Sequence, residues 1–464
     1  MKIAHNKTQF YILLVTTLSS FLTPFMGSAV NVALPAIAQE LSMTALSLSW
    51  VATSFILAAT MTLIPLGRLA DIYGRSRFYV YGALIFTVAS SFCIWSPSQF
   101  FLIAARTVQG VGGAMIFGTG TAMLVSAYPL EERGKIIGIN VAAVYIGLTI
   151  GPFVGGLLTQ HLGWRFIFLF TAALGLIITL IANATIKEEW SGINGKRFDY
   201  AGSLLYAIAL FSLIYGLAQL PSLNAVFLIG TGLLCLALFI FHQLKSPFPL
   251  LDIHLFLNNK VFAFSNLAAL INYCATFAVT FLLSLYLQHI KMLSPSQTGS
   301  ILVAAPVVQA LLSPVAGRLS DRFEPQIISS TGMVLTVIGL VPLIFLSNQT
   351  SIEYVLFCLI LLGVGFALFS SPNVNAIMSA VEKKFFGVAS ATVGTMRLTG
   401  QMFSMGITML VFAVILGDYP ISAANNYLLL KSSKFIFAIL AVICCIGIFA
   451  SLARGKMHNG NNNH

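Results

Sequence analysis

Two arginines that lie inside long apolar segments are the residues best placed to do chemistry in this chain. Arg106 lies within residues 98–126 and Arg397 within residues 386–416, one in each half of the 464 residues. A charged side chain in the middle of a bilayer costs about 3 kcal/mol or more, so each must face protein, water or a ligand. This pattern predicts substrate binding or proton transfer rather than enzyme catalysis, because the sequence has no nucleophile–base set, phosphate loop or metal-ligand spacing.

Arg106 leaves two interpretations open. Its helical face also carries, at spacings of three, four and seven residues, Gln109, Gly110 and Gly113. The arginine could act in a cavity between helices or in a proton relay. Alternatively, it could be a structural arginine that is bonded to backbone carbonyls.

Uncharged polar side chains in the apolar segments could also bind a substrate. Together with the two arginines they form the predicted substrate pathway: Asn31, Arg106, Gln109, Tyr145, Asn272, Tyr273, Gln309, Arg397 and Gln401. A pathway with two cations and no embedded acid has net positive character. It therefore suits neutral or anionic amphiphiles better than lipophilic dications.

The thirteen acidic residues all fall in loops or at the predicted ends of apolar segments. No carboxylate or histidine lies in the middle of such a segment. Proton-coupled exchange usually needs an embedded group whose pKa changes between two access states. Proton coupling therefore stays open, and Asp71, Asp199 or Glu40 could serve only if water reaches them.

The elements that must position these residues are membrane helices. The chain is 58% hydrophobic and 8% charged, far from the composition of soluble globular proteins. Its apolar runs are long enough to cross a bilayer as helices and lack the alternation of a barrel. The fourteen predicted spans are 9–38, 45–66, 78–95, 98–126, 136–158, 165–185, 200–219, 224–243, 261–288, 297–316, 327–346, 352–377, 386–416 and 434–453.

The spans are interrupted by two polar connections, which suggest a division of the chain. We expect an N-terminal six-helix half (1–186), a linker with two extra transmembrane helices (187–259), a C-terminal six-helix half (260–453) and a disordered cytoplasmic tail (454–464). The extra helices are expected to pack at the periphery.

The lysines and arginines predict the orientation. With the N-terminus inside, eighteen of the twenty-four fall on the inner side, which places both termini in the cytoplasm. The basic residues in the connecting loops then account for the net charge of +11, and no nucleic-acid partner is needed to explain it. The six cysteines lie in apolar runs and are expected to be packing residues.

A charged segment occurs twice, which indicates two related halves. Each copy contains the pattern G-R-L-(small)-D, with a proline two or three residues upstream. We interpret the copies as tight connections that form a cytoplasmic gate, in which a charge cluster closes the inner ends of the halves; a plain orientation signal is the alternative. The predicted gate consists of Gly67, Arg68, Asp71, Gly74, Arg75, Arg77, Gly317, Arg318, Asp321 and Arg322.

Another glycine-rich segment has the spacing that lets helices pack backbone to backbone. It contains Gly147, Gly151, Pro152, Gly155 and Gly156. The proline is expected to add a bend to its helix.

These motifs resemble those of the major facilitator superfamily, over essentially the whole chain. Residues 67–77 resemble its cytoplasmic loop motif, Arg106 to Gly112 its R-x-x-Q-G-x-G motif, and Gly147 to Gly156 the motif of its exporters. The two extra spans, the segment from Asn31 to Pro35 and Arg397 resemble the fourteen-span drug/proton antiporter branch. The resemblance implies two six-helix halves that rock about a central site.

One departure concerns coupling, because Met26 stands where this branch has an aspartate. The resemblance implies multidrug-type efflux of small amphipathic compounds by proton antiport, and the short loops suit a bacterial inner membrane. A dedicated exporter of a neutral or anionic metabolite, such as a siderophore, pigment or toxin, is the alternative; a non-transporting membrane sensor is a remote one. We expect a monomer that needs the lipid bilayer but no cofactor or metal.

Overall fold

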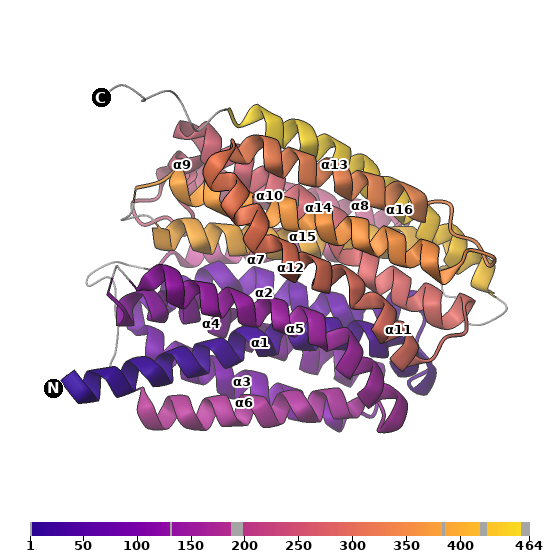
Figure 1. Ribbon diagram of the computed structural model, residues 1–464, viewed down its shortest axis with the longest axis horizontal. Coiled ribbons are helices and arrows are strands. Elements are labelled where there is room, and N and C mark those ends of the chain that lie inside the picture. Colours follow the sequence, from indigo (N-terminus) through magenta and orange to yellow (C-terminus); the bar gives the residue numbers. More distant parts are fainter. Residues whose placement is uncertain (1, 130–131, 187–197, 383–385, 418–424, 456–464) are drawn as a thin grey trace.

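The computed structural model is helical throughout its described part, which contains no strand (Figure 1). The residues outside the described part are 1, 130–131, 187–197, 383–385, 418–424 and 456–464. The elements are α1 (Lys2–Glu40), α2 (Ala45–Tyr73), α3 (Arg75–Ile94), α4 (Gln99–Ala127), α5 (Arg133–His161), α6 (Arg165–Thr185), α7 (Tyr200–Ala218), α8 (Leu223–Lys245), α9 (Ile253–Asn258), α10 (Lys260–Leu285), the π-helical turn η1 (Tyr286–Ile290), α11 (Pro295–Leu302), α12 (Ala304–Arg322), α13 (Pro325–Leu343), α14 (Ile352–Ser379), α15 (Phe386–Ile415) and α16 (Asn426–Ala453).

Among the described residues, fourteen segments are long and apolar enough to cross a membrane. Helix α10 continues through η1 as one span, Lys260–Ile290, and α11 with α12 forms another, Pro295–Ser320. Helices satisfy their own backbone hydrogen bonds, which is what the bilayer interior requires. The prediction of an all-helical integral membrane protein with fourteen spans is confirmed.

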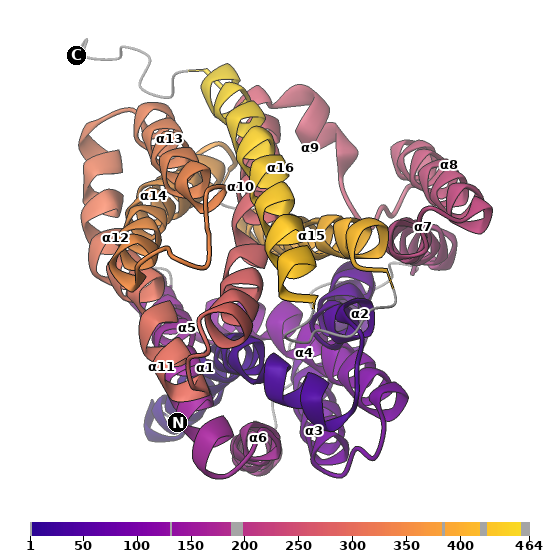
Figure 2. The same cartoon turned by 90° about the vertical axis from the view of Figure 1, so that its right-hand side faces the viewer.

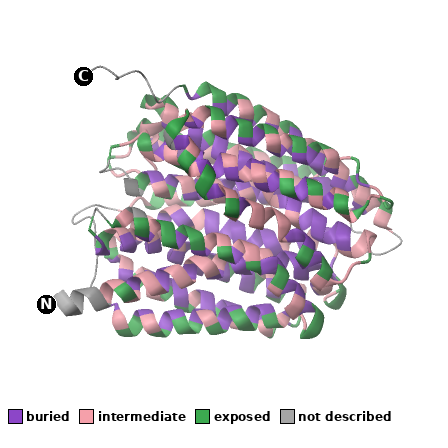
Figure 3. Ribbon diagram, in the orientation of Figure 1, coloured by how far each residue is buried: buried purple, intermediate pink, exposed green. Residues whose placement is uncertain are grey.

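The helices form two bundles that lie side by side (Figure 1), and Figure 3 shows in the same orientation which of their residues are buried. One contains α1–α6, with α1 packed on α5 and α3 on α4, and the other contains α10–α16, with α13 packed on α14 and α10 on α15. The start of α1 and the end of α16 lie at the same end of the molecule, here called the terminal end. The opposite end, where α1 meets α2, is called the distal end.

The helix bounds correct two predictions about the charged repeats. Residues 67–73 are the last turns of α2 and residues 317–322 the last turns of α12, not tight connections. Only Gly74 breaks the chain between α2 and α3, at φ 115°, a backbone conformation that disfavours other residues. The helices continue past the apolar segment because arginine and leucine, which both segments contain, are good helix formers.

The predicted tail also begins too early. Arg454 is 1% exposed, and its guanidinium donates to Asn373 Oδ1 (3.0 Å), the Pro325 carbonyl (2.6 Å) and Ser265 Oγ (3.3 Å). These partners lie on α14, α13 and α10. Arg454 therefore joins four helices of the second bundle at the terminal end, while residues 456–464 lie outside the described part.

The two extra helices are not equivalent. Helix α8 is largely exposed, as expected for a peripheral helix, whereas α7 contacts α2 of the first bundle and α15 of the second (Figure 2). Trp50 of α2 and Tyr215 of α7 place their ring centroids 5.9 Å apart. Helix α7 therefore covers the seam between the bundles from the outside, whereas α8 packs mainly on α7.

A hydrogen-bonded cluster anchors this helical pair at the terminal end. Asp199 caps α7 by accepting from the Gly202 N–H, and it also accepts from Gln243 Nε2 and pairs with His242 Nε2, each at 2.8 Å. Gln243 Oε1 in turn accepts from the Leu250 N–H at 2.6 Å, which fixes the connection toward α10. Burial raises the pKa of Asp199, but these hydrogen bonds outweigh burial and lower it below its ordinary value.

Asp199→Ala is expected to lower the free energy of unfolding by about 2 kcal/mol, because a helix cap is lost and buried donors lose their acceptor. Thermal unfolding of the purified protein measures the loss. Because folding lowers the pKa of Asp199, the stabilisation by its carboxylate is complete at pH values above the ordinary pKa of aspartate. It is lost as the pH falls through the pKa that Asp199 has in the folded protein. Asp252→Ala is the matched control, since Asp252 caps only the six-residue α9 and should cost much less; equal losses would contradict the role of the cluster.

Candidate functional site

Arg106 is enclosed inside the first bundle. Its side chain is 2% exposed; Nε donates to the Val51 carbonyl of α2 (3.0 Å), and Nη1 donates to Gln109 Oε1 (2.6 Å) and Met26 Sδ of α1 (2.7 Å). The guanidinium also lies over the Phe55 ring, 4.6 Å from its centroid. Met26, which stands where a carboxylate was expected, thus contributes a weak uncharged acceptor.

Gln109 extends this network away from the second bundle. It is fully buried, and its Nε2 donates to Ser90 Oγ of α3 at 2.6 Å. The network therefore ties together α1, α2, α3 and α4. This arrangement favours the interpretation of Arg106 as a structural residue, and it does not support the placement of Arg106 and Gln109 on the substrate pathway in this conformation.

Arg397 has a different environment, at the boundary between the bundles. Its guanidinium, on α15, lies over the ring of Phe117 on α4, 4.9 Å from the centroid. Its Nε is buried and has no hydrogen-bond partner among the described residues. The cation of one bundle is thus in contact with an aromatic ring of the other.

Two predicted pathway residues lie near Arg397. Tyr273 of α10 is close enough to interact electrostatically with both Arg397 and Tyr145, which lies on α5 of the first bundle. The Tyr273 ring also meets Phe366 edge to face, with centroids 5.4 Å apart. The structure therefore brings Tyr145, Tyr273 and Arg397 together from three helices.

The other predicted pathway residues do not join this cluster through hydrogen bonds. Asn31 and Gln309 are 5% and 8% exposed, and Gln401 is partly exposed. Asn272 is fully buried, and neither atom of its amide has a hydrogen-bond partner in the described part of the chain. No hydrogen bond or ion pair between described residues links these four to either arginine.

Phe117 was missed by the sequence analysis. The chain contains thirty-seven phenylalanines, and most of them must face lipid or neighbouring helices. No spacing rule distinguishes the one that faces the opposite bundle. The nearest signal is Gly394, one helical turn before Arg397, where an added Cβ would lie 2.7 Å from the Phe117 ring.

The glycine-rich motif of α5 serves two interfaces at the distal half of the helix. An added Cβ at Gly147, Gly151 or Gly155 would collide with α1 of the same bundle, and at Gly155 the nearest atoms belong to Ala29 at 2.7 Å. An added Cβ at Gly156 would instead collide with the Pro295 carbonyl of α11, in the second bundle. The motif therefore packs the first bundle and also lets the bundles touch.

Further contacts close the distal end between the bundles. An added Cβ at Gly299 of α11 would collide with the Pro152 carbonyl, so α5 and α11 approach backbone to backbone on both sides. Gln160 Oε1 accepts from the Ser296 N–H (3.2 Å), and Gln288 Nε2 donates to the Val32 carbonyl (2.9 Å). In Figure 1, α11 reaches the first bundle at this end.

The predicted gate residues of the first copy bond within their own bundle. Arg75 Nε donates to Asp71 Oδ1 at 2.7 Å, and Arg75 Nη1 donates to Ser126 Oγ at 3.0 Å. An added Cβ at Gly67 would meet no atom within 4 Å, so no helix packs closely against that side of this gate position in this conformation.

The arginines of the second copy of the charged segment are on the whole more exposed than those of the first copy. Arg318 and Arg322 are exposed at the end of α12, as Arg77 is at the start of α3, and Arg68 is partly buried. An added Cβ at Gly317 would lie 3.0 Å from Ser371 Oγ. The side chain of Asp321 lies outside the described part, so the two copies can be compared only in their glycines and arginines.

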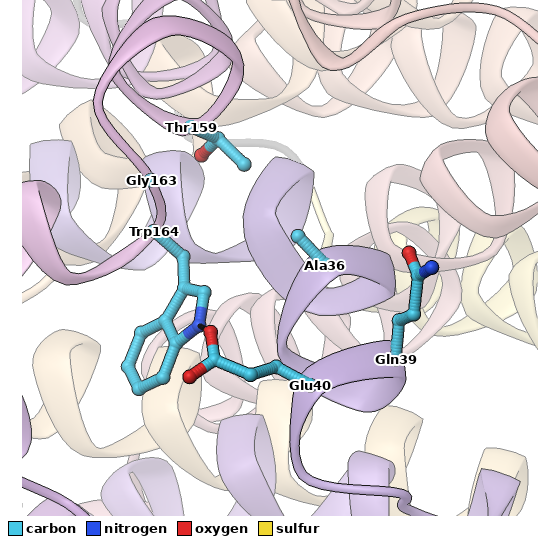
Figure 4. Close-up of a pocket in the computed structure, with 6 residues that line it drawn as sticks. All are labelled: Ala36, Gln39, Glu40, Thr159, Gly163 and Trp164. Atoms are coloured by element: carbon cyan, nitrogen blue, oxygen red, sulfur yellow. Dashed lines mark hydrogen bonds between the residues drawn. The ribbon is translucent and has the colours of Figure 1, made fainter.

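A recess of about 390 Å³ lies at the distal end of the first bundle (Figure 4). It is lined by Ala36, Gln39, Glu40, Thr159, Gly163 and Trp164. The Glu40 carboxylate accepts from Trp164 Nε1 at 2.7 Å and pairs with Arg165. These groups belong to α1, α5 and the start of α6, so the recess is separate from the cluster around Arg397, and Glu40 has a structural partner.

Comparison with known proteins shows which family has this architecture. Residues 16–191 and 266–462 match the family model of the Major Facilitator Superfamily, which is most of the chain. The chain belongs to this superfamily. Members of the superfamily and the relatives below are transporters, so the protein is a multi-pass membrane transporter and not an enzyme.

Two curated relatives span almost the whole chain. The riboflavin transporter RibZ of Clostridioides difficile strain 630 is 29% identical over 446 residues, which cover 96% of this chain and 97% of RibZ. The multidrug resistance protein Stp of Mycobacterium tuberculosis strain CDC 1551 / Oshkosh is 31% identical over 414 residues, covering 88% and 76%. A bacterial homologue of the human lysosomal transporter Spinster, in an inward-facing and unoccupied conformation, shares the fold with a TM-score of 0.70, 15% identity and coverage of 96% and 97%.

Proposed function

We propose that this superfamily member exports small amphipathic organic compounds by alternating access. The observation that carries the proposal is the contact between Arg397 of one bundle and Phe117 of the other, with Tyr145 and Tyr273 beside it. A polar and aromatic group shared by two bundles changes its surroundings whenever the bundles rock. The relative named as a multidrug resistance protein supports export of such compounds.

The bundles α1–α6 and α10–α16 are the proposed moving halves, with α7 and α8 as the linker. The proposed orientation puts the terminal end, and both termini, in the cytoplasm of a bacterium, since most lysines and arginines lie there. The distal contacts between α5 and α11 then close the outer side of the membrane. We propose that the transporter works as a monomer, because each chain carries both halves.

Proton antiport remains part of the proposal, but it lacks the usual embedded carboxylate. Met26 occupies the expected position, Glu40 pairs with Arg165, and Asp199 is bound in its own cluster. Asp71 at the terminal end pairs with Arg75. Asp71 is therefore the acid best placed to change its partners as the halves move.

The experiment that tests the proposal uses proteoliposomes with the purified transporter and a trapped pH-sensitive dye. Cationic, neutral and anionic amphiphiles are added outside, and both substrate accumulation and internal pH are recorded. Accumulation with proton movement supports the exporter driven by antiport, and accumulation without it supports a dedicated exporter driven differently. The absence of movement for every compound would refute the proposed transport.

Uptake of a planar compound is a second candidate, favoured by the similarity to a protein named as a riboflavin transporter. The same proteoliposomes distinguish it when riboflavin is supplied on one side at a time. A preference for movement toward the face that carries the termini would support uptake and contradict export.

Asp71→Asn is expected to slow turnover about five- to tenfold with little change in substrate affinity, since it weakens one charge-assisted pair that must re-form in each cycle. Initial transport rates over a range of substrate concentrations separate the two quantities. Glu353→Gln is the matched control, because Glu353 is a surface acid at the distal end. A loss of affinity at unchanged maximal rate would contradict the gate.

A further inference from the structure

We infer that the site around Arg397 binds planar aromatic anions, that is, ring systems carrying a carboxylate, sulfonate or phenolate. The inference rests on the proposed function and names the substrate class for it. It depends on three features of the structure: the missing counter-charge of Arg397, the ring of Phe117 over which its guanidinium lies, and the aromatic groups contributed by both halves.

The first feature is that Arg397 has no protein counter-charge in the described part of the chain. The ion pairs between described residues join Asp71 with Arg75, Glu40 with Arg165, and Asp199 with His242; none includes Arg397. Its Nε is buried without an acceptor. A buried guanidinium is stabilised when an anion accepts from its planar fork, and a bound carboxylate or sulfonate supplies that acceptor.

Arg397 differs in its surroundings from Arg106, the other arginine that lies in the middle of an apolar helix. Both arginines lie in apolar helices, one in each half. Arg106 donates to a carbonyl, an amide oxygen and a thioether and is 2% exposed, so protein groups occupy its fork. Arg397 is partly exposed and touches a ring instead. The first arginine holds helices together, and the second is available to a ligand.

The second feature is the position of Phe117. An aromatic ring beneath a guanidinium desolvates and orients it but offers its N–H groups no carboxylate or carbonyl acceptor. Phe117 belongs to the opposite half, so the fork is held in this orientation while the bundles keep their present arrangement. Phe117 is therefore a positioning residue for the ligand site.

The third feature selects a flat, aromatic ligand. Tyr273 of α10 lies near the cation, Tyr145 of α5 lies near Tyr273, and Phe366 meets the Tyr273 ring edge to face. Aromatic walls favour planar ring systems through offset or edge-to-face contacts. A cationic ring would meet the charge of Arg397 with no carboxylate among the described groups nearby, so the same site disfavours cations of the same shape.

Two dyes that share a xanthene ring and differ in charge test the inference. Fluorescein is a dianion at pH 8, whereas rhodamine 123 is a cation. Fluorescence anisotropy with the purified full-length protein measures binding of each. We expect fluorescein to bind at least about tenfold more tightly than rhodamine 123, and Arg397→Gln to weaken fluorescein binding at least about tenfold without weakening that of rhodamine.

Two further variants protect the test against misfolding. Arg397→Lys keeps the charge and loses the fork, so it should bind fluorescein between wild type and Arg397→Gln. Phe117→Leu should weaken fluorescein binding about fivefold by removing the ring that orients the fork. Lys431→Gln is the charge-matched control, because Lys431 is exposed on α16 and should leave binding unchanged.

Equal affinities for the two dyes, or unchanged fluorescein binding in Arg397→Gln and Arg397→Lys, would overturn the inference. Accumulation of rhodamine 123 but not fluorescein in proteoliposomes would also overturn it, while the proposed transport would stand. Fluorescein binding that depends on Arg397, without movement of either dye across the membrane, would support the ligand class and refute transport instead.

Discussion

Gly156→Ala is expected to keep the distal end of the transporter open and to slow turnover at least about tenfold. The added methyl group would collide with the Pro295 carbonyl, a backbone atom of α11 that cannot move without its helix. The collision arises only when α5 and α11 are together, so it raises the free energy of the closed arrangement and not that of the open one. A tenfold effect requires about 1.4 kcal/mol.

Spin labels on the two halves measure this shift directly. Cysteines replacing Gln39 of α1 and Gln349, which are exposed at the distal end, carry the labels in a background without the native cysteines. Double electron–electron resonance should show a longer distance in Gly156→Ala than in the unsubstituted background. Transport rates of the unlabelled variant provide the second measurement.

The same helix supplies two controls. Gly138 is exposed on α5 and an added Cβ there meets nothing within 4 Å, so Gly138→Ala should change neither distance nor rate. Gly155→Ala collides with Ala29 inside the first bundle and should reduce the amount of folded protein without opening the distal end. An unchanged distance and rate in Gly156→Ala would show that α5 and α11 do not form the outer closure.

These neighbouring glycines show which part of the fold could be predicted from the sequence. The spacing of Gly147, Gly151, Gly155 and Gly156 predicted close helix packing, and the structure has it. The spacing could not predict the partners, because adjacent helical positions differ by about 100° and so face different neighbours. The hydrophobicity of the sequence predicted the fourteen spans, because it shows which segments are apolar enough to lie in a bilayer. It could not predict the interfaces, because it does not show which helices contact each other.

The two arginines show the same limit for the candidate site. In the sequence, Arg106 and Arg397 are alike: each is a lone cation in an apolar segment of one half. Their difference depends on acceptors from distant segments, such as the carbonyl of Val51 and the thioether of Met26, and on the ring of Phe117. Carbonyls occur at every position of the chain, so no pattern of side chains reveals which of them accepts from an arginine.

Arg106→Ala is expected to remove most of the folded protein from the membrane, with a loss of about 3 kcal/mol or more in stability. The substitution leaves Gln109 Oε1 and the Val51 carbonyl without their donor and empties the space over Phe55. Each hydrogen bond to a charged group contributes about 1.5–3 kcal/mol, while the relief of burying an uncompensated charge offsets part of the sum. Three helices lose their common contact at once.

Fluorescence-detected size-exclusion chromatography of the membrane extract measures the folded amount, and transport per folded molecule measures function. Lys431→Ala removes an exposed cation of α16 and should leave the folded amount unchanged. Arg106→Lys keeps the charge but cannot reach all three acceptors with a planar fork, so an intermediate amount is expected. A normal amount of folded Arg106→Ala protein that does not transport would place Arg106 in the transport pathway. A small amount of folded protein in which each molecule still transports at the normal rate would show that Arg106 holds α1, α2 and α4 together.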